Sequence, residues 1–230
     1  MTLGDQFVLP LDSAPSYGRE DFLVGKSNER AFDHIARWPH WLAPAALLIG
    51  PEGSGKTHLA AIFATQSHAR MIRGDHLTLA NVPEIARNRA VVLEDCDRFP
   101  PDEVALFHLF NLARETGLFL LLTARLPQGD WGVVLPDLAS RLRLQPGFAL
   151  LEPDDSLLAA LFVKHIADRQ IHVDQGVVAY ALARIERSYR AVHELVATVD
   201  KLSLARKRPV TRALVAEALG RPAEDSDRQD

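Results

Sequence analysis

Apolar and polar positions follow two different patterns along the chain, and the change comes near Pro153. Before it, three short apolar runs, at 43–50, 90–97 and 118–125, are candidate strands. Stretches with helical spacing accompany them, at 28–38, 57–68 and 103–117. Strands that are apolar on both faces are typical of a parallel sheet covered by helices on both sides. The pattern therefore predicts an α/β domain, which we place at 21–153.

After Pro153 the spacing of apolar residues is helical throughout, and we find no strand candidate. The first stretch opens with aspartates, which are favoured at the start of a helix. The expected helices lie at 154–170, 174–186, 188–206 and 211–220. The sequence therefore predicts a small all-helical domain at 154–220, after the α/β domain.

The two ends of the chain fit neither pattern. Residues 1–20 mix Gly, Pro, Ser and Asp around one apolar hexapeptide, QFVLPL, and residues 221–230 are polar. We expect a flexible arm at 1–20 and a disordered tail at 221–230. An apolar hexapeptide in such an arm favours a docking peptide, although an edge strand or a packing tail is an alternative.

Composition narrows the class of protein. The 230 residues are 47% hydrophobic and 24% charged, as in an ordinary globular protein. The net charge of −4 argues against a protein that coats nucleic acid, although it leaves room for a local basic patch. Cys96 is the single cysteine, so no internal disulfide forms. No apolar run reaches the ~18 residues of a membrane span, and no signal peptide is evident. We therefore expect a cytoplasmic protein with no membrane partner.

The segment GPEGSGKT fits G-x-x-x-x-G-K-[ST] at every fixed position. In this motif backbone N–H groups surround a polyphosphate, the lysine meets the outer phosphates and the last hydroxyl ligates Mg²⁺. A predicted strand precedes the segment and a predicted helix follows it, which is the arrangement that the motif requires. Lys56 and Thr57 are the firmest site residues. The expected nucleotide-binding residues here are Gly50, Pro51, Glu52, Gly53, Ser54, Gly55, Lys56, Thr57 and His58.

Two acidic residues end the second apolar run. Metal-assisted phosphoryl transfer needs a carboxylate near Mg²⁺ and another group that orients water. By position, Glu94 would join Thr57 as a metal ligand and Asp95 would polarise the water. The two roles can be exchanged, because Glu is one methylene longer than the usual Asp. An ordinary acidic loop is the other interpretation.

Two arginines are candidates for sensing phosphate. Arg141 lies in LPDLASRLRL, a short helix-like stretch, and Arg190 lies in SYRAVHEL within the helical domain. A planar guanidinium that is always charged suits recognition of a γ-phosphate, either in its own subunit or in a neighbour. A solvated or salt-bridged surface arginine is the alternative for each.

A phosphate loop, an acidic strand end and a helical lid together resemble an AAA+ ATPase module. FLVGKSNERAF resembles the adenine-side box of the replication initiator DnaA, and LPDLASRL resembles the stretch that ends in the arginine finger of the DnaA/Hda family. KRPVT resembles the continuation of the DnaA sensor 2 helix. The resemblance covers roughly residues 6 to 219; the phosphate loop is generic, and the other boxes are specific to this family.

The resemblance implies an AAA+ P-loop parallel sheet with flanking helices and a small helical lid. It also implies ADP or ATP with Mg²⁺ as cofactor, with Phe22 and Val24 on the adenine side. Arg190 would contact the nucleotide of its own subunit, and Arg141 would act as a finger in trans.

In Hda-type members a hexapeptide like QFVLPL docks on the replicative sliding clamp. Gln6 would hydrogen-bond at the edge of the groove, while Leu9 and Leu11 would fill apolar pockets. Proline stiffening keeps the entropic cost of binding low. The residues expected to bind the clamp are Gln6, Phe7, Leu9, Pro10 and Leu11.

The sequence departs from the family at two points. Arg125 stands at the sensor 1 position, where Asp or Asn is usual, and Glu94 replaces the usual Asp. Both departures predict weak or no intrinsic ATPase activity. The extent of that activity, the resting nucleotide and assembly into a homo-dimer or larger oligomer stay open.

The resemblance therefore implies a regulator of replication initiation that binds the clamp and promotes hydrolysis of DnaA-bound ATP. DnaA has a C-terminal helix-turn-helix domain that would start where this chain ends, so we expect no sequence-specific DNA binding. A DnaA-related helicase loader that binds single-stranded DNA is the alternative, but the basic triplet at 206–208 has no aromatic partners. Arg125 speaks against a third interpretation, a standalone ATPase.

Overall fold

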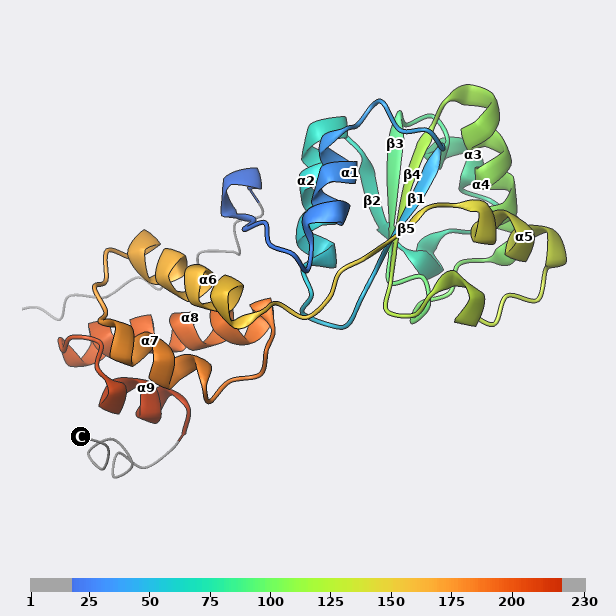
Figure 1. Ribbon diagram of the computed structural model, residues 1–230. Helices are drawn as coiled ribbons and strands as arrows, with labels where there is room; N and C mark the ends of the chain where they lie inside the picture. Colours follow the sequence, from blue (N-terminus) through green and yellow to red (C-terminus); the bar gives the residue numbers. More distant parts are fainter. Residues whose placement is uncertain (1–17, 221–230) are drawn as a thin grey trace, which may run out of the picture.

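The computed structural model of the chain describes residues 18–220 (Figure 1). Five parallel strands form one sheet in the order β2-β3-β4-β1-β5. The strands are β1 (Ala45–Ile49), β2 (Arg70–Arg73), β3 (Ala90–Glu94), β4 (Phe119–Ala124) and β5 (Gly147–Ala149). Because all strands run the same way, the carboxyl ends of β1, β3 and β4 meet at one edge of the sheet.

Helices cover both faces of the sheet (Figure 1). Alternate strand residues, such as Leu47 and Leu48 on β1, belong to different apolar clusters. One cluster joins the sheet to α1 (Glu29–Ala36) and α2 (Lys56–Ser67). The other joins it to α3 (Val82–Ile85), α4 (Glu103–Thr116) and α5 (Pro136–Leu144). The predicted parallel sheet with flanking helices is confirmed.

Two strands escaped the sequence analysis. β2 has the sequence RMIR and is exposed at both ends, and β5 has three residues, two of them exposed. Both lie at the edges of the sheet. β2 has an arginine at each end, and β5 has only three residues and begins at a glycine, so neither stands out as a buried apolar strand. The short α3 was also missed.

A bundle of four helices follows the sheet, and we call it the lid. Its helices are α6 (Asp155–Asp168), α7 (Gln175–Leu182), α8 (Tyr189–Arg206) and α9 (Arg212–Ala218). They share one apolar cluster of their own. Each begins at a capping side chain that accepts a hydrogen bond from the backbone N–H three residues later. The capping residues are Asp154, Asp174, Ser188 and Thr211.

Three short 3₁₀ turns complete the described part of the chain. They are η1 (Arg19–Asp21), η2 (Gly74–His76) and η3 (Gln128–Asp130). The first precedes α1 and reaches the lid, because Lys164 on α6 forms an ion pair with Asp21 at 2.5 Å. In Figure 1 the lid lies on the α1–α2 side of the sheet, and α5 lies on the other side.

None of the helices within residues 18–220 is both long enough and apolar enough to cross a membrane.

Candidate functional site

The loop between β1 and α2 carries the phosphate-binding motif at the carboxyl edge of the sheet. Gly53 and Gly55 have φ values of +74° and +95°, which side chains other than glycine rarely adopt. Gly50 approaches the strand end after β5, where an added Cβ would stand 2.2 Å from the carbonyl oxygen of Leu150. The glycines of the motif therefore also serve the local backbone geometry.

Lys56 is the first residue of α2 and is only 7% exposed. Its Nζ donates hydrogen bonds to the carbonyl oxygens of Gly50 and Pro51, at 2.7 and 2.8 Å. Burial lowers the pKa of the ammonium group, and the negative charge of Asp95 opposes that shift. The loop thus keeps its cation inside the turn that an anion would enter.

Glu94 and Asp95 follow each other at the end of β3 but face different surroundings. Burial raises the pKa of the half-buried Glu94 carboxyl, while a hydrogen bond with Thr57 acts in the opposite direction. Asp95 lines the cavity described below and has a φ of +53°. Its backbone N–H donates to Thr123 Oγ1 at 3.0 Å. Glu94 therefore lies near Thr57, and Asp95 faces the open space.

The pair of Thr57 and Glu94 supplies the oxygen ligands that Mg²⁺ prefers. Within residues 18–220 there is no group of three or more His, Cys, Asp or Glu side chains arranged to hold a metal. An ion at this place would therefore take its remaining ligands from water and phosphate oxygens, as Mg²⁺ commonly does.

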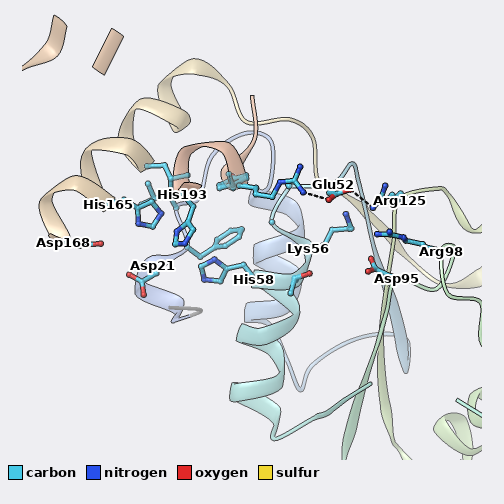
Figure 2. Close-up of a pocket in the computed structure, with 18 of the residues that line it drawn as sticks. Asp21, Glu52, Lys56, His58, Asp95, Arg98, Arg125, His165, Asp168 and His193 are labelled. Carbon is cyan, nitrogen blue, oxygen red and sulfur yellow. Dashed lines mark hydrogen bonds and ion pairs between the residues drawn. The ribbon is translucent and has the colours of Figure 1, made fainter. Parts of the chain in front are cut away.

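Glu52, the second variable residue of the motif, lies between two arginines (Figure 2). One carboxylate oxygen accepts a hydrogen bond from Arg125 Nη2 at 2.7 Å, and the other accepts one from Arg190 Nη1 at 2.5 Å. Arg125, and then Arg190, lower the pKa of the Glu52 carboxyl. The carboxylate thus links the end of β4 to the first turn of α8.

Arg125 is oriented by its own backbone. Its N–H and that of Leu126 both donate to Asp97 Oδ2 at 3.0 Å. Asp97 therefore fixes the chain just after β4, where the sequence resemblance puts sensor 1. The side chain reaches back toward the phosphate loop instead of into solvent.

A cavity of about 590 Å³ extends from this charged edge to the lid (Figure 2). This volume lies in the range of small-molecule sites. Its phosphate-loop end is lined by Glu52, Gly53, Gly55, Lys56, Thr57, Asp95, Arg98, Arg125 and Arg190. Its lid end is lined by Asp21, Phe22, Leu23, His58, Leu161, His165, Asp168, Arg169, Tyr189 and His193. The lid and the sheet therefore each supply one part of the wall.

Aromatic rings gather at the lid end of the cavity. The Phe22 ring stacks on Phe32 and Tyr189, with centroids 5.7 and 6.4 Å apart, and meets the edge of His58 at 5.2 Å. Burial lowers the pKa of His165 to about 4, so its imidazole is neutral at pH 7. This end can receive a flat, uncharged ring, whereas the other end can receive an anion.

The structure brings most of the expected residues together at one place. Phe22, Asp95, Arg190 and several motif residues line the same cavity. Val24 is 47% exposed and does not line it. Arg141 lies on α5 with its guanidinium 4.8 Å from the Phe107 ring centroid, outside the cavity. The clamp-binding hexapeptide at 6–11 and the predicted tail at 221–230 lie outside the described residues.

Sequence reasoning missed part of the wall. Asp21, Arg98, Tyr189 and His193 line the cavity, but no motif singles out any of them, although Asp21 directly precedes Phe22 and His193 lies in the segment SYRAVHEL. Tyr189 had one available signal, because it directly precedes the candidate Arg190. The others become neighbours only through the packing of the lid against the sheet.

Comparison with known proteins places this site in a wider context. No family model matches the chain. Two curated proteins, the chromosomal replication initiator protein DnaA of Lactiplantibacillus plantarum and that of Thermomicrobium roseum, are each 24% identical to it. Each match covers 89% of this chain and 50% of the relative. The chain thus spans about half the length of these curated relatives.

The solved domain III of Thermotoga maritima DnaA superposes with a TM-score of 0.76 at 16% identity, covering 90% of this chain and 97% of that one. The chain has the fold of DnaA domain III. DnaA from Aquifex aeolicus bound to AMPPCP gives a TM-score of 0.69 at 19% identity, over 84% of this chain and 69% of that one. Thermotoga maritima RuvB, a further AAA+ protein, gives 0.70 at 17% identity, with coverages of 86% and 69%. The chain therefore shares its overall fold with DnaA and RuvB.

Proposed function

We propose that the cavity of this DnaA-like chain binds an adenine nucleotide together with Mg²⁺. The phosphate loop, its buried Lys56 and the ring-lined lid end support the proposal. DnaA of similar fold binds AMPPCP, an adenine nucleotide analogue. Thr57 and Glu94 would hold the ion, which would neutralise phosphate charge. Lys56 would contact the outer phosphates, and Phe22 with Tyr189 would line the base.

Two features of the site would make hydrolysis of the bound nucleotide slow. Asp95 would polarise the attacking water, but Arg125 replaces the polar sensor 1 residue and is held by Glu52. Glu94 also stands where the usual residue is Asp, one methylene shorter. We therefore propose that bound nucleotide mainly sets the conformation of the chain.

A thermal-unfolding measurement tests the nucleotide site. Mg-ADP should raise the melting temperature by mass action, adding about 2.7 kcal/mol to the free energy of unfolding at a concentration of 100 Kd. Lys56→Ala should abolish the shift, because it removes the buried cation. Lys201→Ala on the exposed face of α8 is the matched control and should keep the shift. A wild-type melting curve indifferent to both ADP and ATP would exclude the site.

At the level of biological role, we propose an Hda-like regulator that promotes hydrolysis of DnaA-bound ATP on the sliding clamp. The position of Arg141 carries this proposal. It lies outside its own nucleotide cavity, on a helix at the side of the sheet away from the lid (Figure 1). An arginine so placed is suited to the nucleotide of a neighbour and of little use to its own. Leu144, three residues after Arg141 on α5, is 80% exposed, so an apolar side chain is accessible on the same helix.

The hexapeptide Gln6–Leu11 supplies the clamp half of the proposal on sequence grounds alone. Changing Gln6, Leu9 and Leu11 together to alanine should abolish binding to immobilised clamp in surface plasmon resonance. We expect the melting temperature to stay unchanged, because these residues lie in the predicted arm at 1–20, outside the two predicted domains. Equal clamp affinity of the variant and the wild type would remove the support for a clamp-bound regulator.

The alternative, a helicase loader that binds single-stranded DNA, finds less support. Of the basic triplet at 206–208, Arg206 forms an ion pair with Glu217 of α9. Part of the positive charge of the triplet is therefore already neutralised by an ion pair within the lid.

A further inference from the structure

Glu52 is unexpected at its place in the phosphate loop. The motif works through backbone N–H groups and Lys56, and it leaves the side chain at position 52 free to vary. A carboxylate there adds negative charge beside the place where a polyphosphate would lie, and like charges at short range repel. A physical reason for its presence must therefore lie in what it contacts.

Its contacts are two cations that line the same end of the cavity as Lys56. Arg125 and Arg190 come from separate elements, β4's end and α8, and each donates to a different oxygen of Glu52. Arg98 lines the same part of the cavity and adds positive charge. The carboxylate thus occupies a place between guanidinium groups that resembles the surroundings of a bound phosphate oxygen (Figure 2).

We propose that Glu52 makes this site selective for nucleoside diphosphates over triphosphates, because its carboxylate takes the two guanidinium groups that a γ-phosphate would need. The inference rests on the proposed nucleotide site and adds a specificity-determining residue to it. A diphosphate enters while both ion pairs persist. A triphosphate brings charge toward Glu52 and competes for Arg125 and Arg190, so its binding includes the cost of breaking two charged hydrogen bonds.

The same contact also joins the lid to the phosphate loop. The backbone N–H of Tyr189 donates to Gly53 O at 3.1 Å, directly beside the Arg190–Glu52 pair. A diphosphate would therefore leave the lid in the position seen here. A ligand that displaces Glu52 would break the Arg190–Glu52 pair and leave the lid joined to the loop through the Tyr189–Gly53 hydrogen bond.

Calorimetric titration of the 230-residue chain with Mg-ADP and with Mg-AMPPCP tests the proposal. The wild type should bind ADP more tightly. Glu52→Gln keeps the size of the side chain and removes its charge, so the affinity for AMPPCP should rise up to about fivefold, as expected for an exposed ion pair, while the affinity for ADP changes less than twofold. Glu52→Asp keeps the charge and should keep a preference for ADP.

Glu194→Gln is the matched control. Glu194 lies 3.7 Å from Arg190 as its i,i+4 partner on α8 and does not line the cavity. Its replacement should leave the ADP-to-AMPPCP affinity ratio at the wild-type value. An unchanged ratio in Glu194→Gln would show that losing a partner of Arg190 is not by itself enough to alter the ADP-to-AMPPCP affinity ratio.

The possible results distinguish the selectivity role of Glu52 from the proposed nucleotide site on which it rests. If both ligands bind and Glu52→Gln keeps the wild-type ratio, the selectivity role of Glu52 is wrong and the nucleotide site stands. If neither ligand binds the folded wild type at millimolar concentration, both proposals are wrong. Thermal unfolding of each variant shows whether it is folded. If Glu52→Gln is not folded, the ADP-to-AMPPCP affinity ratio of Glu52→Asp tests the proposal in its place.

Discussion

At the scale of single residues, His34 shows how burial changes the chemistry of a side chain far from the candidate site. Its ring lies between Trp41 and Phe148, with centroids 4.4 and 4.1 Å away. Its Nε2 is buried without a hydrogen-bond partner. Burial, and then the charge of Arg37, lower the pKa of His34 to about 4 from 6.5. The folded protein therefore holds this imidazole neutral.

This shift predicts a pH dependence of stability. Between pH 6.5 and 4 the unfolded chain binds a proton at His34 that the folded protein does not, so the free energy of unfolding falls as pH falls. His34→Phe keeps a ring in the sandwich and removes the titration. Urea unfolding at pH 7 and pH 5 should show a smaller loss of stability for the variant than for the wild type. Equal losses in the two proteins would contradict the assignment.

Whether a site residue could be predicted from the sequence depends on how far along the chain its partners lie. Lys56 and Thr57 were predictable because the motif spaces them along one loop. The pairing of Glu52 with Arg125 and Arg190 was not, because it joins three separate elements. Periodicity and spacing describe neighbours in sequence, whereas such contacts depend on how the lid packs.

At the scale of elements, Asn28 joins the segment before α1 to the lid. It is 1% exposed, and its side chain contacts Gly25 N, Leu23 O and Tyr189 Oη at 2.7 to 2.9 Å. The Asn28 Oδ1 accepts the first bond and its Nδ2 donates the other two. One buried amide therefore fixes the segment that carries Phe22 against α8.

Asn28→Ala should lower the free energy of unfolding by about 1–3 kcal/mol, because it leaves buried polar groups unpaired. It should also weaken nucleotide binding, since Phe22 and Tyr189 lose their common anchor. Urea unfolding and a titration with Mg-ADP measure both effects. Asn81→Ala, which removes two exposed hydrogen bonds, is the control and should cost less. An equal, small effect of the two variants would show that the junction does not depend on Asn28.

Elements were predictable where burial or capping left a mark in the sequence. The lid helices begin at Asp154, Asp174, Ser188 and Thr211, whose capping side chains stand before apolar spacing. β1, β3 and β4 lie inside the sheet and are apolar on both faces. β2 and β5 are edge strands, and their sequences leave little mark, because β2 has an arginine at each end and β5 has only three residues.

At the scale of the whole molecule, the candidate nucleotide site and the candidate finger lie on different sides of the sheet. The cavity opens between the phosphate loop and the lid, and Arg141 lies on α5 away from the lid (Figure 1). The sequence pattern predicts a parallel sheet and, after it, a helical lid. It does not predict the cavity between them, because the cavity forms only when the lid packs against the sheet. Under the proposed function, such an arrangement would let one chain bind its own nucleotide and present an arginine to another.

The rate at which ATP-DnaA becomes ADP-DnaA, in the presence of clamp loaded on DNA, tests the proposed role most directly. Wild-type chain should accelerate this conversion, and Arg141→Ala should lose about 10³-fold of the acceleration, as expected when an arginine finger is removed. Its ADP affinity should stay at the wild-type value, because Arg141 lies outside the cavity, and its melting temperature should fall only slightly, since one partly exposed contact with Phe107 is lost. Arg143→Ala, an exposed arginine on the same helix, should accelerate like the wild type. Full acceleration by Arg141→Ala would contradict the finger assignment, and no acceleration by the wild type would contradict the regulator itself.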